Sequence, residues 1–225
     1  MSDRYFVEVQ AICVAAGFVR KGKTFFRVWG DGVLQVIQYK YERVFCSEVI
    51  VIGLFSMYDD LQAQWFTARG AIPRYSVVNC YEQSQMPQVF VPPIGAQIKM
   101  LQNRVMQWLN SIDTQKKLIT AIRKLDPRWN DNLKIGPYLA CGESNHAKKV
   151  IKEIICQHNY AWHRRMTMQD VPTEKLLVDF ERGENRFHSL LDLINRGDMS
   201  QVDAYLKSNY DRNMRLASFC VSRDD

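Results

Sequence analysis

The side chains with the greatest chemical capacity lie between residues 141 and 163: Cys141, His146, Cys156, His158 and His163. Zinc sites hold such ligands at short, regular spacings that bring them to one point. On a helix over residues 145 to 163, Cys156 and His158 point about 200° apart, so they cannot share an ion. The spacing along the sequence also gives no sign that a histidine lies beside either thiol to act as a base. The cluster therefore predicts neither a metal nor a cofactor.

Motifs of the common enzyme classes are absent from the sequence. It has no G-x-G-x-x-G, G-x-S-x-G, H-E-x-x-H or S-x-x-K pattern. The carboxylates Asp59 and Asp60 are adjacent, and neighbours on an extended chain point to opposite faces, so they make a poor acid and base couple. The sequence favours a non-enzymatic protein, with an enzyme of unassigned chemistry as an alternative.

Basic side chains concentrate in the middle of the chain. Residues 111 to 169 carry 11 basic and 5 acidic side chains, whereas residues 170 to 225 carry 8 and 11. Lysines and arginines beside aromatic rings suit a nucleic-acid groove, but the solvated faces of amphipathic helices give the same pattern. Nucleic acid is therefore an alternative partner, with a candidate set of Lys116, Lys117, Lys148, Lys149, Lys152, Arg164 and Arg165.

The stretch "GFVRKGKTFFRVWGDGVLQVIQYKY", residues 17 to 41, supplies the second candidate site. Its basic start could cradle a phosphate, but a phosphate loop runs from strand into helix and here the order is reversed. We interpret these charges as keeping a hairpin solvated and oriented. If Trp29 and Tyr41 flank one exposed patch, they have the composition of a protein-binding hot spot; alternatively they lie beneath the C-terminal helices. The predicted partner-binding set is Arg20, Lys21, Lys23, Arg27, Trp29, Tyr39 and Tyr41.

The elements that position these residues begin with a helix over residues 3 to 16, ended by Gly17. A hairpin over residues 23 to 41 follows, with its turn at Gly30-Asp31-Gly32. Residues 47 to 56 predict a central strand, because 49 to 55 are apolar apart from Gly53. The sequence thus predicts an antiparallel sheet of three or more strands.

Beyond residue 59 the pattern changes towards helices. "YSVVNCY" could add a fourth strand, and "PQVFVPPIG" an edge strand or loop. Apolar residues at helical spacing then predict a helix with Ile98, Leu101, Val105, Trp108 and Ile112 on its buried face. Further helices are expected over residues 113 to 125 and from Ser144 or Asn145 onwards. In the C-terminal part, one helix is expected to end at Gly183, and two more to be joined by Arg196-Gly197-Asp198.

Strands followed by helices predict the α+β class, with an α+β domain at 1–165 and a helical C-terminal extension at 166–225 that packs on it. No apolar run approaches the roughly 20 residues of a membrane helix. The six cysteines form no C-x-x-C pair, as expected of reduced thiols in the cytoplasm. The sequence therefore predicts a soluble cytoplasmic protein with no membrane partner.

The N-terminal order of a helix ending in Gly17-Phe18, then "RKGKTF", then a strand leading through a turn to "VLQVIQYKY" resembles the family known as domain of unknown function 4304. The resemblance covers about the first 60 residues. It implies a helix with an antiparallel sheet in a bacterial cytoplasmic setting, and it brings no activity and no site residues. Together these patterns favour a binding module with a protein partner, whose identity and oligomeric state they do not predict.

Overall fold

The structure of the 225-residue chain is a computed structural model. It describes the backbone of residues 3–43, 46–59, 61, 75–83, 91–125, 135–167 and 174–221. Within these ranges, side chains are described except at residues 3, 157–167, 174–184 and 218–221.

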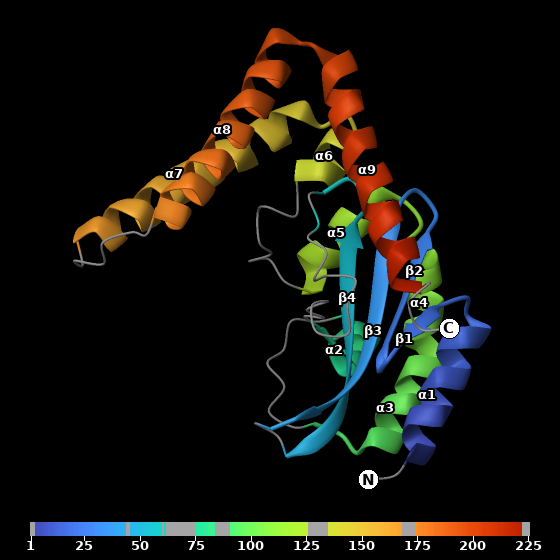
Figure 1. The fold of residues 1–225 in the computed structure, drawn as a ribbon. Coiled ribbons are helices and arrows are strands. Elements are labelled where there is room, and N and C mark those ends of the chain that lie inside the picture. Colours follow the sequence, from blue (N-terminus) through green and yellow to red (C-terminus); the bar gives the residue numbers. More distant parts are fainter. Residues whose placement is uncertain are drawn as a thin grey trace.

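The chain forms a helix, then a five-stranded antiparallel sheet, then a mostly helical remainder, which confirms the predicted α+β class (Figure 1). The sheet contains β1 (Val19–Lys21), β2 (Thr24–Trp29), β3 (Val33–Glu42), β4 (Ser47–Ser56) and β5 (Tyr75–Ser76). The helical elements are α1 (Asp3–Ala15), α2 (Val77–Glu82), α3 (Ile94–Met100), the π-helical turn η2 (Leu101–Val105), α4 (Met106–Ser111), α5 (Gln115–Leu125), α6 (Ile135–Ala140), α7 (Ser144–Thr167), α8 (Glu174–Arg196) and α9 (Met199–Val221).

The strands follow one another in sequence order, so the sheet is a meander. The predicted hairpin is β2 and β3, and its turn uses positive φ at Gly30 and Gly32, which glycine adopts without steric cost. Strand β4 lies between β3 and the short β5, and most of its residues are buried. The prediction of a central strand over residues 47 to 56 is therefore confirmed.

One face of the sheet packs against α1 and the helical run from α3 to α4. The ring of Phe6 on α1 lies 5.9 Å from that of Phe25 and 5.7 Å from that of Tyr39. The side chain of Gln97 on α3 accepts a hydrogen bond from the Ile50 backbone N–H at 2.9 Å. Buried residues also occupy the opposite face of β3, so the sheet is covered on both sides.

The π-helical turn η2 changes which residues of its helix are buried. Ile98, Leu101 and Val105 are buried as predicted, but the wider turn shifts the residues that follow, so Met106 and Leu109 take the next buried positions. The prediction that Trp108 belongs to the buried face is therefore only partly right. Trp108 is half-buried, at the edge of the core.

Two further predictions need correction. In "YSVVNCY" the strand stops at Ser76, because the Ser76 hydroxyl accepts the Asn79 N–H at 3.1 Å and so caps α2. Gly183 was expected to end a helix but lies inside α8. The residues of "PQVFVPPIG" before position 91 lie outside the described residues.

Helices α7 and α8 run side by side away from the sheet, and α9 returns along it (Figure 1). The α8–α9 joint is at Gly197, with Asp198 accepting the Gln201 N–H, as predicted. The predicted domain boundary at 165 and 166 falls within α7. Earlier in α7, Ile151 and Ile154 belong to an apolar cluster with Leu190 and Ile194 of α8. No described helix is long and apolar enough to cross a lipid bilayer.

Candidate functional site

The basic residues at the start of the hairpin are held by the chain itself. Arg20 donates to the side-chain oxygen of Gln10 at 2.9 Å and to the Gly22 carbonyl at 3.0 Å, and its guanidinium lies 5.0 Å from the Phe6 ring centre. Lys23 lies over the ring of Tyr39. These contacts give Arg20 and Lys23 a role in covering the aromatic rings of α1 and β3.

Arg27 is buried, with 6% of its surface exposed. Its guanidinium donates to the side-chain oxygens of Gln35 and Asn110 and to the carbonyl of Ala16. The rings of Phe18 and Trp29 lie on it, with centres 4.4 and 4.3 Å away. Among the described ion pairs none involves Arg27, so this cation is held by neutral groups.

The aromatic residues of the predicted partner-binding set do not gather in one patch. Tyr39 is 3% exposed, whereas Trp29 and Tyr41 are 37% and 46% exposed. Trp29 pairs with Val33, and Tyr41 lies eight residues further along β3, or ~26 Å. Burial removes Arg27 and Tyr39 from the surface a partner could touch, and Trp29 and Tyr41 occupy opposite ends of the hairpin.

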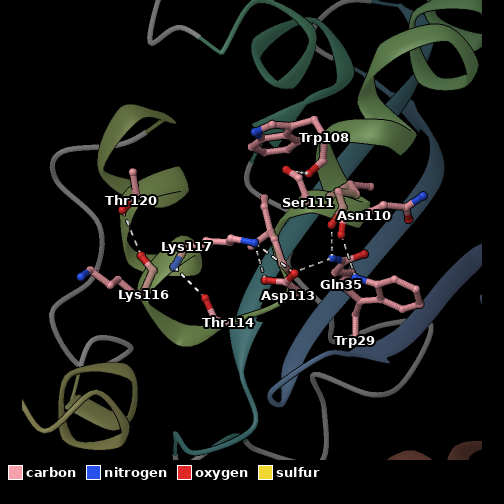
Figure 2. Close-up of polar contacts among 12 residues, drawn as sticks. Trp29, Gln35, Trp108, Asn110, Ser111, Asp113, Thr114, Lys116, Lys117 and Thr120 are labelled. Atoms are coloured by element: carbon pink, nitrogen blue, oxygen red, sulfur yellow. Dashed lines mark hydrogen bonds and ion pairs between the residues drawn. The ribbon is translucent and has the colours of Figure 1, made fainter.

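A different group of side chains converges at a hollow of about 540 Å³ between the end of α2, α4 and α5. We call it the basic hollow. Figure 2 shows several of its residues, including the Trp108 ring beside Ser111 and the two lysines at the start of α5. Its lining consists of Gln83, Trp108, Ser111, Ile112, Lys116, Lys117, Thr120, Ala121 and Lys124.

Helix α5 places its lysines here because its apolar residues fill the other side. Leu118, Ile122 and Leu125 are buried. Residues 116, 117, 120 and 124 lie on the exposed face, where 116, 120 and 124 are four apart and 117 is three before 120. The helix start is fixed against the hairpin turn. The Asp31 N–H donates to the Asp113 carbonyl at 2.7 Å, and a Cβ at Gly30 would lie 2.0 Å from that same oxygen.

The charge of the basic hollow is only partly neutralised. Lys117 pairs with Asp113 at 2.8 Å, and this hydrogen bond and charge lower the pKa of the Asp113 carboxyl (Figure 2). Among the described side chains, Lys116 and Lys124 have no ion-pair partner. The Thr120 hydroxyl donates back to the Lys116 carbonyl at 2.9 Å. The arrangement can hold anionic groups beside an aromatic ring.

The structure brings only part of the predicted nucleic-acid set into the basic hollow. Lys116 and Lys117 line it. Lys148, Lys149 and Lys152 lie instead on α7, where Lys149 approaches Glu153 at 3.8 Å. The side chains of Arg164 and Arg165 lie outside the described residues.

Sequence reasoning missed Trp108, Thr120 and Gln83 as site residues, and it placed Lys124 in the basic region without including it in the candidate set. Helical spacing places Thr120 and Lys124 beside Lys116 and Lys117, so that part of the site was readable from the sequence. The exposure of Trp108 depends on the π-helical turn, and Gln83 owes its place to its position just after the last residue of α2. Neither the π-helical turn nor the position of Gln83 could be predicted from the types of the residues involved.

The described cysteines are free thiols, and two of them, Cys13 and Cys80, are buried. Among the described residues, no three His, Cys, Asp or Glu side chains are placed to hold a metal ion. Burial raises the pKa of the Cys13 thiol to about 12 and also raises that of Cys80, which keeps both thiols protonated. The side chains of His158 and His163 lie outside the described residues.

Comparison with protein-family models, with curated proteins and with solved structures finds no match for this chain. The resemblance of the first 60 residues to domain of unknown function 4304 is neither supported nor contradicted, and it stays a prediction.

Proposed function

We propose that the protein is a non-enzymatic binding module and that its basic hollow holds an acidic segment of a protein partner. The observation that carries the proposal is that three lysines of α5 line the same hollow as Trp108, and that only Lys117 among them has a described carboxylate partner. Exposed ammonium groups beside a half-buried indole offer charge attraction and apolar contact area together. We further propose a cytoplasmic location, which the free thiols of Cys13, Cys80 and Cys141 support.

The size of the basic hollow favours a short segment. Lys116 and Lys124 are eight residues apart on α5, so their backbones are ~12 Å apart along the helix axis. An extended run of about four residues spans ~13 Å. Two or three charged contacts thus suit a short acidic stretch, whereas nucleic-acid binding proteins usually neutralise more phosphates over a longer track.

Single-stranded nucleic acid is the second candidate partner, and Trp108 is the observation that favours it. An indole beside lysines is the arrangement in which a base stacks while its phosphates meet the charges. This alternative needs a longer basic track, for which Lys148, Lys149 and Lys152 on α7 are the available side chains.

The test is fluorescence anisotropy of the full chain with two labelled probes, a peptide with a run of glutamates and a thymidine oligonucleotide. Lys116→Glu with Lys124→Glu reverses two charges of the basic hollow, and we expect peptide affinity to fall about thirtyfold, or ~2 kcal/mol. Lys99→Glu is the matched control, because Lys99 is exposed on α3 outside the basic hollow. It should leave binding within about twofold.

The α7 variant Lys152→Glu separates the two partner classes. Loss of oligonucleotide binding in both Lys152→Glu and the α5 variant, with a steep salt dependence, would favour nucleic acid. Loss of peptide binding in the α5 variant alone would favour the acidic segment. Equal affinities for wild type, the control and the α5 variant with both probes would refute a binding role for the basic hollow.

A further inference from the structure

Figure 1 shows where α6 and α9 lie relative to β4. A second cavity is lined by residues of α6, α9 and the segment just after β4. We call it the junction cleft. Its volume of about 450 Å³ falls within the roughly 300 to 1,000 Å³ of small-molecule sites, which favour junctions between packed units. Its described lining is Asp31, Tyr58, Leu139, Ala140, Asp203, Leu206, Lys207, Tyr210 and Asp211.

The inner surface of the junction cleft is apolar and aromatic. Leu139 and Leu206 are buried, and the rings of Tyr58 and Tyr210 lie with centres 5.4 Å apart. Gly32 makes room for this pair, since a Cβ there would lie 3.0 Å from the Tyr210 ring and 3.2 Å from the Tyr58 ring. Two tyrosine rings and two leucines therefore form the apolar part of the lining.

The rim of the junction cleft carries excess negative charge. Three carboxylates, from Asp31, Asp203 and Asp211, stand against the single ammonium group of Lys207. Among the described side chains, neither Asp203 nor Asp211 has an ion-pair partner. Residues 203, 207 and 211 share one face of α9, because they are spaced by four.

Tyr58 joins the aromatic surface to the charged rim. Its hydroxyl donates to the Asp31 carboxylate at 2.8 Å. Burial, together with this hydrogen bond and charge, raises the pKa of Tyr58 to about 12, so the phenol stays neutral near neutral pH. One oxygen of the Asp31 carboxylate therefore has a fixed hydrogen-bond donor next to the ring pair.

The walls of the junction cleft are tied together before any ligand binds. Asn209 of α9 donates to the Tyr58 carbonyl at 3.0 Å. Asn213, one turn later, donates to the carbonyls of Met57 and Asp59 at 2.8 Å each. Both asparagine side chains are buried, so these bonds fix α9 on the chain that follows β4. A site held in this way loses little conformational entropy on binding.

We propose that the junction cleft is a binding site for a small organic cation. Its ammonium, guanidinium or amidinium group lies among the carboxylates of Asp203, Asp211 and Asp31, and its apolar part covers the Tyr58 and Tyr210 rings. Carboxylates and aromatic faces both attract cations, and the ring faces do so even where the charge is poorly hydrated. This site does not depend on the basic hollow, so the two proposals stand or fall separately.

Benzamidine is a suitable probe, because it joins a flat amidinium cation to an aromatic body and has a neutral counterpart of the same shape, benzamide. Isothermal titration of the full chain should show saturable benzamidine binding with a Kd of roughly 0.1 to 1 mM, as expected for so small a ligand. Benzamide should bind at least about tenfold more weakly. Equal affinities for the two compounds, or no saturation by benzamidine at about 10 mM, would overturn the proposal.

Variants locate the binding. Asp203→Asn together with Asp211→Asn should weaken benzamidine binding about tenfold, whereas Asp192→Asn, an exposed carboxylate on α8, should leave it unchanged. Tyr210→Leu removes one ring face and should weaken binding about threefold, while Tyr210→Phe keeps the ring and the affinity. Circular dichroism checks that each variant is folded. If Tyr210→Leu does not fold, the aspartate variants still test the proposal. Wild-type benzamidine affinity in the Asp203→Asn and Asp211→Asn double variant would contradict the location of the site.

Discussion

Replacing Arg27 by methionine should destabilise the protein by ~3 kcal/mol, although no described carboxylate pairs with this arginine. Methionine keeps an unbranched apolar stem between the Phe18 and Trp29 rings but removes every donor. Three acceptors, the Ala16 carbonyl and the side-chain oxygens of Gln35 and Asn110, then lose their bonds to the guanidinium.

The magnitude follows from two opposing contributions. Hydrogen bonds to a charged group contribute about 1.5 to 3 kcal/mol each, so three of them exceed ~4 kcal/mol. Removing a buried cation also ends the cost of keeping it from water, which offsets part of that loss. Arg27→Lys should lose ~2 kcal/mol, because a single ammonium cannot at once reach acceptors just after α1, on β3 and on α4.

Urea unfolding monitored by tryptophan fluorescence is the assay. With a slope of about 3 kcal/mol per molar urea for a chain of this size, Arg27→Met should lower the midpoint by about 1 M. Arg20→Met is the matched control, because Arg20 is exposed and its loss should cost within ~0.5 kcal/mol. A midpoint shift for Arg27→Met no larger than that of Arg20→Met would refute the reasoning that this neutral cage holds the hairpin to α1 and α4.

Two further predictions concern the chain segment after β4. Burial raises the pKa of Asp59 from 3.8 to about 8, although the hydrogen bond from the Gly136 N–H and the charge of Arg186 act to lower it. Between these two pH values the folded protein therefore holds a proton that the unfolded chain releases. Stability should therefore fall as pH rises through this window, by at most ~1.4 kcal/mol per pH unit, and Asp59→Asn should flatten the trend; identical urea midpoints against pH for both proteins would contradict this origin. Gly136→Ala should cost ~2 kcal/mol, since its Cβ would lie 2.6 Å from the Tyr58 carbonyl carbon and 2.7 Å from the Asp59 nitrogen, whereas Gly95→Ala, whose Cβ would meet nothing closer than 4.0 Å, should be neutral or stabilising in calorimetry.

The elements readable from the sequence are those in which local pattern and packing agree. The hairpin has both alternation and a turn whose glycines take positive φ, and α5 has an apolar stripe that all becomes buried. The sites were harder to predict from the sequence, because they depend on residues from distant parts of the chain that the fold brings together. The same residue pattern allows Arg27 to face solvent or Asn110, and only the arrival of α4 decides between them. Asp31 and Asp203 are far apart in sequence and meet only through the fold.

The return of α9 along the sheet has a consequence for how the chain is synthesised. Ala217 of α9 belongs to the same apolar cluster as Phe25 and Val36 of the hairpin, about 190 residues earlier. At about 5 to 20 residues per second, a ribosome needs roughly 10 to 40 seconds to span that interval. The hairpin therefore leaves the ribosome well before its full apolar covering exists. Contacts this distant in sequence also slow folding, because a long loop must close first. The strands of the nascent chain therefore expose apolar side chains during translation until the last helix is made.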